Sequence, residues 1–361
     1  MVRNPKQAFW KNCRVFITGH SGFKGSWMTS LLLNLGAKVK GLSLPLDDSN
    51  FLFNKIKKSI EDNVESIYGD ILDKQLVKKT VKEYQPEIIF HFAAQPIVGL
   101  SYLDPLKTWE TNVIGTLNLM DCLSEIKDQC SLIVITTDKV YENKESLYGY
   151  RENDRLGGSD IYSSSKGAAE IAISSFYRTY FNSEDCNIKI ASARAGNVIG
   201  GGDWSKDRLI PDFIKSWQRG QELQLRSPNS TRPWQHVFDP LFGYLLLGAK
   251  LSLGNVKSGH SFNFGPDPSK EVSVAELLDV ASSLLGSKTN HVKVKKTSFE
   301  EAGLLKLNCD KAAKLLGWRP QIDVDLALKL TMSWYKEYSE KNHVVSRLSE
   351  KQLECFMNEA F

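Results

Sequence analysis

The sequence contains no apolar run of about 18 residues, the length that a membrane-spanning helix needs. Residues 1–19 also lack the apolar core and small-residue cleavage site of a signal peptide. The six cysteines are scattered without a C-x-x-C pair, which argues for reduced thiols and against a structural zinc site. The net charge of only +4 argues against nucleic-acid binding. These absences favour a cytoplasmic protein with no metal, membrane or nucleic-acid partner.

What the sequence does contain is a regular alternation of apolar runs and amphipathic segments. The apolar runs expected to be strands are "RVFITG" (14–19), "KVKGLSL" (38–44), "EIIFHFAA" (87–94), "SLIVITT" (131–137) and "IKIASARAG" (188–196). The segments expected to be helices are Trp27–Leu35, Lys74–Glu83, Trp109–Leu123 and Ser164–Tyr180. Strands that alternate with helices predict right-handed βαβ crossovers. We therefore expect an α/β protein with a Rossmann-type, doubly wound parallel sheet.

The alternation loosens after about residue 200, where Gly, Pro, Trp and Arg become frequent. We expect residues 1–200 to form the nucleotide-binding domain, with a returning strand near 235–265. Residues 201–338 are expected to form mainly a smaller substrate-binding lobe. Residues 339–361 read as a helical tail of unknown role.

A glycine-rich turn follows the first expected strand. Gly19, Gly22 and Gly25 recur at three-residue intervals in "GHSGFKGSW", just before a helix. Glycines there allow a tight turn and let a pyrophosphate approach the helix N-terminus. The end of the second strand, residues 42–45, has no acid for an adenosine ribose. Because His20 and Lys24 are expected near the phosphates, a 2′-phosphate stays open beside NAD.

A second motif is "DIYSSSKGAAEI", in which Tyr162 and Lys166 lie four residues apart and share one face of a helix. A nearby ammonium lowers the pKa of a phenol, so Tyr162 is expected to act as a base. Thr137, at the end of the strand about 25 residues earlier, is expected to share the substrate proton. The alternative is a tyrosine and a lysine on a surface helix.

Together these motifs resemble the Thr-Tyr-Lys set of the short-chain dehydrogenase/reductase superfamily. Its extended, nucleotide-sugar branch is indicated by "HFAAQPIVGLSY", "TNVIGT", "TTDKVYEN", "YRENDRLGG", "ARAGNVIGGGDW", "DRLIPD", "RPWQHV" and "DKAAKLLGWRP". The lysine after Thr137-Asp138, with "GGGDW" and "RPWQHV", is similar to the CDP-glucose 4,6-dehydratase group. The similarity extends from about Asn12 to Tyr338.

The resemblance implies a lyase that makes a 4-keto-6-deoxy sugar for surface polysaccharide, with tightly held NAD regenerated in each turnover. Thr137, Tyr162 and Lys166 would remove the 4-hydroxyl proton. Asp138, with a pKa raised by burial, would be the general acid for the leaving 6-hydroxyl. Lys139 stands where dTDP-glucose dehydratases carry a Glu as the C5 base. It would be a desolvated base or would stabilise the enolate.

Two alternatives stay open for this strand end. Lys139 could form a salt bridge with Glu142 or Asp154, and Asp138 could cap a turn.

The resemblance also assigns binding residues. Those expected at the cofactor are Gly19, His20, Ser21, Gly22, Phe23, Lys24, Gly25, Asp70, Ile71, Ala93, Ala94, Gln95, Thr136, Tyr162, Lys166 and Ala195. Those expected at a nucleoside-diphosphate hexose are Ser101, Asn197, Arg208, Leu209, Arg232, Trp234 and His236. Arg208, Arg232 and His236 suit a diphosphate. Asn197 could instead hold a turn, and Trp234 could pack in the core. His91 is expected to be a core histidine.

Two departures from the group bear on substrate choice: Gly99-Leu100 stands where arginines are frequent, and Ser230-Thr231 where an apolar residue is usual. The rival functions are therefore a dehydratase or epimerase for GDP-, dTDP- or UDP-sugars and, more remotely, a non-catalytic dinucleotide sensor. An epimerase would not need Asp138, and a sensor would not need the Tyr-Lys pair. Residues 109–123 and 164–180 would form the contact of a homodimer or a higher homo-oligomer.

Overall fold

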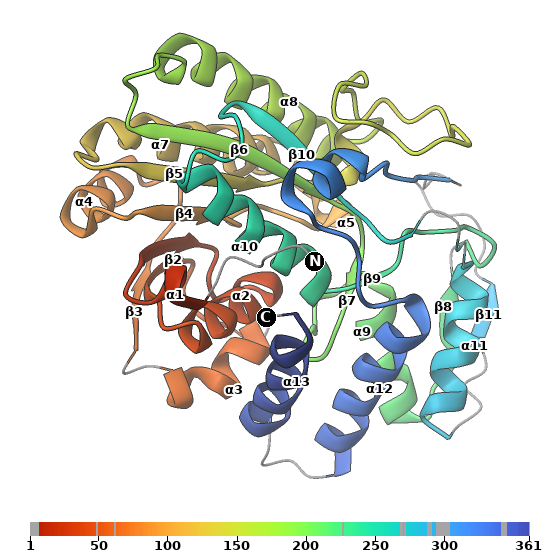
Figure 1. Ribbon diagram of the computed structural model, residues 1–361. Coiled ribbons are helices and arrows are strands. Elements are labelled where there is room, and N and C mark those ends of the chain that lie inside the picture. Colours follow the sequence, from red (N-terminus) through yellow and green to blue (C-terminus); the bar gives the residue numbers. More distant parts are fainter. Residues whose placement is uncertain are drawn as a thin grey trace.

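A fully parallel, seven-stranded sheet forms the centre of the molecule (Figure 1). The computed structural model describes residues 7–47, 50–60, 63–225, 227–267, 270, 272–286, 291–293, 304–340 and 345–360. From edge to edge the strands are β3 (Val64–Tyr68), β2 (Lys38–Ser43), β1 (Arg14–Thr18), β4 (Ile88–His91), β5 (Cys130–Ile135), β6 (Ile188–Ala195) and β10 (His260–Phe264). The winding reverses between β1 and β4, as in doubly wound Rossmann-type sheets. The expected fold class is confirmed.

Helices cover both faces of this sheet (Figure 1). Successive residues of β1 enter different cores: Val15 and Ile17 pack on one face and Phe16 on the other. The first face carries α2 (Phe23–Asn34) and α10 (Phe238–Ser252), and the second carries α4 (Lys74–Tyr84), α7 (Gly115–Asp121) and α8 (Ile161–Phe176). Because both faces are covered, the central strands β4 and β5 are buried at every position rather than at alternate ones.

The remaining elements are shorter or lie outside the sheet. The other α-helices are α1 (Gln7–Trp10), α3 (Phe51–Ile60), α5 (Val98–Leu103), α6 (Pro105–Trp109), α9 (Leu209–Arg219), α11 (Val274–Leu284), α12 (Val324–Glu340) and α13 (Val345–Ala360). Short 3-10 or π-helical turns are η2 (Glu110–Ile114), η3 (Cys122–Glu125), η4 (Asp138–Val140), η5 (Tyr177–Phe181) and η6 (Ala312–Leu316). Two small parallel pairs join β7 (Val198–Ile199) to β9 (Gln235–His236) and β8 (Leu223–Leu225) to β11 (His291–Lys293). The β8–β11 pair, α9 and α11 gather at one end of the molecule, at the lower right of Figure 1.

The last helix, α13, is part of the folded body. It packs against α3 and α12. The ring of Phe356 lies 5.0 Å from that of Phe238, which in turn meets the ring of Trp27 on α2. The indole N–H of Trp334 donates to the hydroxyl of Ser349 at 3.1 Å. The C-terminal helix therefore closes the core behind the helix that follows β1.

Candidate active site

The candidate site lies at the carboxyl edge of the sheet, where β1, β4, β5 and β6 end side by side. Ligands of open α/β sheets bind in the crevice that forms there, at the point where the winding reverses. The predicted residues follow these strand ends in the chain.

Glycine is required at two positions of the turn after β1. Gly19 has a φ of +75°, and a Cβ atom built on it would lie 2.8 Å from the amide nitrogen of Ala93. A Cβ on Gly25 would lie 2.0 Å from the carbonyl oxygen of Gly19. Gly22 is the N-cap residue of α2 and makes no side-chain cap bond. The first backbone N–H groups of α2 therefore have no capping side chain, an arrangement suited to an anionic phosphate.

The side chains of this turn differ from the expectation at His20. Its ring packs against Gly41, and its Nε2 lies 3.0 Å from the hydroxyl of Ser66. Burial lowers the pKa of His20 to about 4. His20 is therefore a neutral side chain held against β2 and supplies no cation to the phosphates, whereas contact of its backbone with the cofactor stays a prediction.

Lys24 instead extends toward the catalytic groups. Burial lowers its pKa to about 7, and the charges of Arg208, Asp138 and Lys166 act on it.

Hydroxyl and amide groups occupy the end of β2, where the sequence shows no acid. The hydroxyl of Ser21 donates to that of Ser43, the last residue of β2, at 2.9 Å. The side-chain amide of Asn50 donates to the carbonyl and hydroxyl oxygens of Ser21, each at 3.1 Å. These groups tie the loop after β2 to the glycine turn.

Asp70 and Ile71, after β3, border the same edge. Asp70 forms an ion pair with Lys107 at 3.1 Å, and Ile71 is buried against Gly115.

The segment after β4 is fixed by the protein itself. The amide of Ala93 donates to the hydroxyl of Thr18 at 3.3 Å. The side-chain amide of Gln95 donates to the hydroxyl of Thr108 and to the carbonyl of Ile97. The position of this segment beside the crevice suits contact with a cofactor through Ala93 and Ala94, whereas the backbone N–H and carbonyl of Gln95 are bonded to Asn112. His91 lies between the hydroxyls of Thr18 and Thr116, at 2.6 and 3.0 Å, and is the core histidine that the sequence predicts.

Strand β5 delivers the three residues Thr137, Asp138 and Lys139. The Thr137 hydroxyl donates to Asp138 Oδ1 at 3.0 Å and accepts from the amide of Lys139 at 3.3 Å. Thr137, not Asp138, is therefore the cap of η4. Asp138 is only 1% exposed. Burial raises the pKa of its carboxyl group, against the opposing charge of Lys139, as the sequence analysis expects.

Lys139 forms no salt bridge with the acids considered for it. Glu142 pairs instead with Arg155 at 3.1 Å and with Lys144 at 3.8 Å. Asp154 accepts the amide of Arg151 at 2.7 Å. In the described part of the chain the salt-bridge alternative is thus not realised, and the ammonium of Lys139 acts electrostatically on Asp138.

Helix α8 delivers Tyr162 and Lys166. Asp160 caps the helix by accepting the amide of Ser163 at 3.0 Å, which fixes the turn that carries Tyr162. Tyr162 and Lys166 are both buried. The ammonium of Lys166 donates to the carbonyl of Ile135 at 3.2 Å, so it is anchored to the end of β5.

The acidity of Tyr162 differs from the expectation. Burial raises its pKa to about 12, and the groups that act in the opposite direction are the Thr137 hydroxyl and the charge of Arg208. Burial also lowers the pKa of Lys166, to about 8. The expectation that the ammonium lowers the phenol pKa of this protein is therefore wrong in its net direction, because desolvation outweighs the neighbouring charges.

Two residues predicted at the cofactor belong to the protein's interior. The hydroxyl of Thr136 donates to Glu170 Oε1 at 2.6 Å, away from the crevice. The side chain of Ala195 lies in the main apolar core. A direct role for the Thr136 hydroxyl at the cofactor is thus not supported.

The predicted substrate residues fall into two groups. Arg208 pairs with the buried Asp203 at 3.2 Å, and its charge acts on Tyr162 and Lys24. The charge of Arg232 acts on Asp138. These two arginines therefore approach the catalytic groups from the C-terminal part of the chain. Leu209 starts α9 next to Arg208, and Asn197 follows β6 in a partly exposed position.

Ser101, Trp234 and His236 are buried. The hydroxyl of Ser101 donates to the carbonyl of Val98 at 2.7 Å. The ring of His236 stands edge-on to that of Phe238, with 4.6 Å between centroids, and burial lowers its pKa to about 3. His236 is therefore neutral, so it would offer a diphosphate a polar rather than a cationic group, and its contact with the substrate stays a prediction. Trp234 packs against the main core, the alternative that the sequence left open.

Two residues of the site were not assigned from the sequence. Asn112 lies in the π-helical turn η2, donates to the hydroxyl of Ser165 at 2.9 Å and accepts the amide of Gln95 at 2.8 Å. It thus links α8 to the segment after β4, and π-turns are frequent at functional sites. Tyr244 on α10 is buried under Asp138 and Tyr162, whose charges act on it, and its hydroxyl has no partner among the described residues. The motif "TNVIGT" contains Asn112 and was a sequence signal for it, whereas no motif pointed to Tyr244.

The described residues contain no cluster of His, Cys, Asp or Glu that could hold a metal ion. They also contain no helix that is long and apolar enough to span a membrane.

The parallel sheet and the glycine turn define a Rossmann-type, nucleotide-binding architecture. The sequence model of the GDP-mannose 4,6 dehydratase family matches residues 16–331, and the chain belongs to this family. A CDP-glucose 4,6-dehydratase of Salmonella typhimurium is 42% identical over 333 residues, which cover 91% of this chain and 92% of that protein.

Solved structures are similar as well. A dTDP-glucose 4,6-dehydratase of Bacillus anthracis, in complex with NAD, has a TM-score of 0.75 and 25% identity and covers 91% of this chain and 98% of its own. A UDP-glucose 4-epimerase of Thermotoga maritima shares the fold, with a TM-score of 0.77 and 21% identity over 90% of this chain and 99% of its own.

Proposed function

We propose that this chain is a nucleotide-sugar 4,6-dehydratase that converts CDP-glucose to CDP-4-keto-6-deoxyglucose and water with NAD as its resident cofactor. The observation that carries the proposal is the pairing of Thr137 with the buried acid Asp138 opposite Tyr162. The 42% identity to a CDP-glucose 4,6-dehydratase supports the nucleotide and the sugar.

The turn after β1 fits the dinucleotide. Gly19 and Gly25 leave no room for a side chain, and the first turn of α2 offers backbone donors for a pyrophosphate. Ser43 and the Asn50-bound Ser21 stand where an adenosine ribose would lie. When bound, NAD would supply a reversible hydride acceptor for the sugar. A hydride that returns to the same substrate explains a redox-neutral reaction.

The chain's own residues then divide the proton work. Tyr162 would accept the proton of the 4-hydroxyl, helped by Thr137, whose hydroxyl acts to lower the pKa of the phenol. Lys166, fixed on the carbonyl of Ile135, would stabilise the phenolate by its charge. Asp138, whose pKa is raised by burial, would act as the general acid for the leaving 6-hydroxyl. Lys139 would act on the C5 position as base or as enolate stabiliser.

The second candidate function is another member of the same branch, a dehydratase or epimerase for a GDP-, dTDP- or UDP-sugar. The departures at Gly99-Leu100 and Ser230-Thr231 favour it, because they lie in segments expected to contact the substrate. A non-catalytic sensor is not favoured, since both Tyr162 and Lys166 are present and buried.

We also propose a homodimer built on α5–α7 and α8. Leu103, Leu106, Trp109 and Ile114 are exposed on the first group and Ile171 on the second, and α6 and η2 pack beside α8. Exposed apolar side chains concentrated on neighbouring helices are typical of a protein interface. Light scattering of the pure protein, with Leu106→Asp as the disruptive variant, tests this assembly.

A cytoplasmic location is part of the proposal. All six cysteines are free thiols in the structure, as expected in a reducing compartment.

The decisive experiment is incubation of the enzyme with CDP-, dTDP-, GDP- and UDP-hexoses, followed by the absorbance of the 4-keto-6-deoxy product in alkali. We expect a signal with CDP-glucose. A signal with another nucleotide alone would favour the second candidate, and no signal with any of them would overturn the dehydratase.

A further inference from the structure

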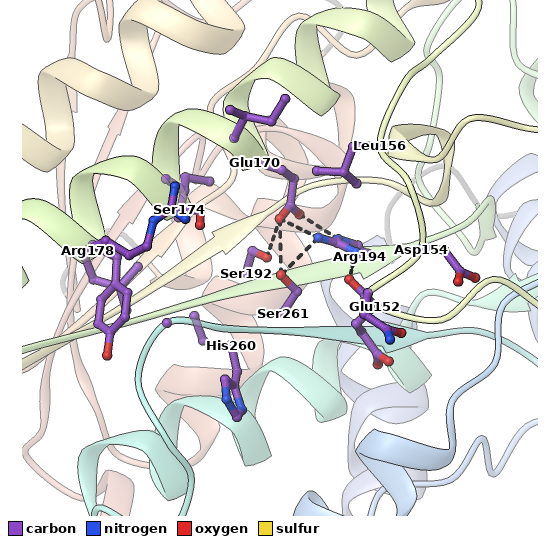
Figure 2. Close-up of a pocket in the computed structure, with 17 residues that line it drawn as sticks. Glu152, Asp154, Leu156, Glu170, Ser174, Arg178, Ser192, Arg194, His260 and Ser261 are labelled. Carbon is purple, nitrogen blue, oxygen red and sulfur yellow. Dashed lines mark hydrogen bonds and ion pairs between the residues drawn. The ribbon is translucent and has the colours of Figure 1, made fainter. Parts of the chain in front are cut away.

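A buried ion pair lies behind the catalytic end of β5 (Figure 2). Arg194 on β6 contacts Glu170 on α8 twice, with Nη2 2.9 Å from Oε2 and Nε 3.0 Å from Oε1. Their side chains are only 4% and 3% exposed. They lie beside a cavity of about 320 Å³ between α8, β6 and β10. Burying two charges costs free energy, because both groups lose their hydration. The contacts of the pair with neighbouring groups indicate its role.

The polar groups of the pair are occupied by the protein rather than free for a ligand in the cavity. All five N–H groups of Arg194 donate: two to Glu170, and one each to the hydroxyl of Tyr141, the carbonyl of Glu152 and the hydroxyl of Ser261. Glu170 additionally accepts from Ser192 at 2.8 Å. All N–H groups of Arg194 are therefore used in hydrogen bonds to the protein, and the pair acts on the protein around it.

The outward link of Glu170 leads to the catalytic strand. Thr136 donates its hydroxyl to Glu170 Oε1 at 2.6 Å. The carbonyl of the preceding residue, Ile135, accepts a hydrogen bond from the Lys166 ammonium at 3.2 Å. Two side chains one helical turn apart on α8 thus hold Ile135, the last residue of β5, and Thr136, the residue after it. The next residues along the chain are Thr137 and Asp138.

The same spacing places the negative charge of Glu170 close to the positive charge of Lys166. Tyr162, Lys166 and Glu170 are four residues apart and share one face of α8. Burial lowers the pKa of Lys166 to about 8, and the Glu170 carboxylate is the group that opposes this shift. From the other elements, Lys24 of α2, whose pKa burial lowers to about 7, and the neutral ring of His91 of β4 face the ammonium. Among the described residues, Glu170 is the one acid that supports the charge of Lys166.

We propose that Glu170 is a positioning residue of the reaction. It holds Thr136, and through it the Thr137–Asp138 strand end, and it keeps the Lys166 ammonium charged beside Tyr162. This inference rests on the proposed function only for the identity of the reaction.

The test compares Glu170→Gln, which keeps the shape and removes the charge, with the matched control Ser261→Ala, which removes a neutral donor from the same carboxylate. The readouts are NADH binding, followed by fluorescence, and kcat/KM for CDP-glucose, both between pH 6 and 10. The wild type is expected to lose both as Lys166 deprotonates near pH 8. In Glu170→Gln this loss moves down by about one pH unit, because an opposite charge has been removed. In Ser261→Ala it stays in place.

Glu170→Gln leaves Arg194 as a buried, unpaired cation and thus risks unfolding. The double variant Glu170→Gln/Arg194→Gln removes both charges, and the same downward shift is expected. Thr136→Val tests the strand contact alone: kcat falls about tenfold or more, while the pH profile keeps its position.

An unshifted profile in either folded Glu170 variant overturns the electrostatic part of the inference, and wild-type kcat in Thr136→Val overturns the positional part. Failure of the wild type to bind NADH or to turn over CDP-glucose would instead contradict the proposed function.

Discussion

The carboxylate of Asp138 lies directly against Gly196, at the end of the neighbouring strand β6. A Cβ atom on Gly196 would be 2.8 Å from Asp138 Oδ2 and 2.9 Å from Cγ of Pro233. Gly196 does not have a positive φ, so glycine is required there because of space and not because of backbone conformation. The candidate general acid can therefore take its position only because Gly196, after the neighbouring strand, has no side chain.

Gly196→Ala is accordingly expected to displace Asp138 with little effect on the fold. A misplacement of about 1 Å costs up to about 100-fold in rate, so kcat for the dehydration should fall by about 10- to 100-fold. Steady-state kinetics measure the loss, and thermal unfolding checks that the fold is kept. A variant with normal kcat would show that Asp138 needs no fixed position.

Asp138→Asn removes the proton that we assign to the leaving 6-hydroxyl but keeps the shape of the side chain. Oxidation at C4 should continue and water loss should stop, because the two steps use different groups. NADH absorbance should therefore accumulate on the enzyme after CDP-glucose is added. Unimpaired formation of the 4-keto-6-deoxy product would remove Asp138 from its role.

Lys139→Met tests the C5 step. If the ammonium acts as base or supports the enolate, exchange of the C5 hydrogen with solvent should slow by about 100-fold or more, as is typical for a lost acid-base group. Deuterium incorporation at C5 in D2O, followed by mass spectrometry, is the measurement. Lys144→Met is the matched control, since Lys144 is an exposed lysine that pairs with Glu142. Equal exchange in both variants would assign the C5 step elsewhere.

Asp239 makes the stability of the protein depend on pH. Its buried carboxylate accepts the amides of Gln321 and Ile322, yet burial raises its pKa from 3.8 to about 7. A pKa that is higher in the folded state gives a stabilisation that is complete below pH 3.8 and is lost as the pH rises through about 7.

Asp239→Asn cannot ionise. The free energy of unfolding of the wild type should therefore decrease relative to that of the variant by roughly 4 kcal/mol between pH 4 and 8. Urea unfolding at several pH values measures this difference. A difference that does not change with pH would contradict the assignment.

The sequence predicts the features that are encoded locally. The strand-helix alternation and the glycine spacing lie within short segments, and a buried parallel sheet is the arrangement that satisfies them. Tyr162 and Lys166 follow for the same reason, because their four-residue spacing needs only the helix that contains them. Burial of Asp138 also follows from its place after an apolar strand.

Features that depend on packing between distant segments were not predictable. The pKa of Tyr162 rises because several elements bury it, which no local motif records. His236 follows a proline-tryptophan segment that resembles a ligand loop, but it is enclosed by the aromatic core. Thr136 is adjacent to catalytic residues in sequence, yet its hydroxyl meets Glu170, 34 residues away. Only the register of β5 and β6 under α8 decides these contacts.

The position of α13 has a consequence for how the protein is made. A ribosome completes β1 and α2 early, but Phe356, which seals the aromatic contacts around Phe238, emerges more than 300 residues later. Until then the nascent nucleotide-binding half has an uncovered hydrophobic surface, the kind of surface that chaperones recognise. Maturation of the first-synthesised part therefore waits for a helix that is made more than 300 residues later.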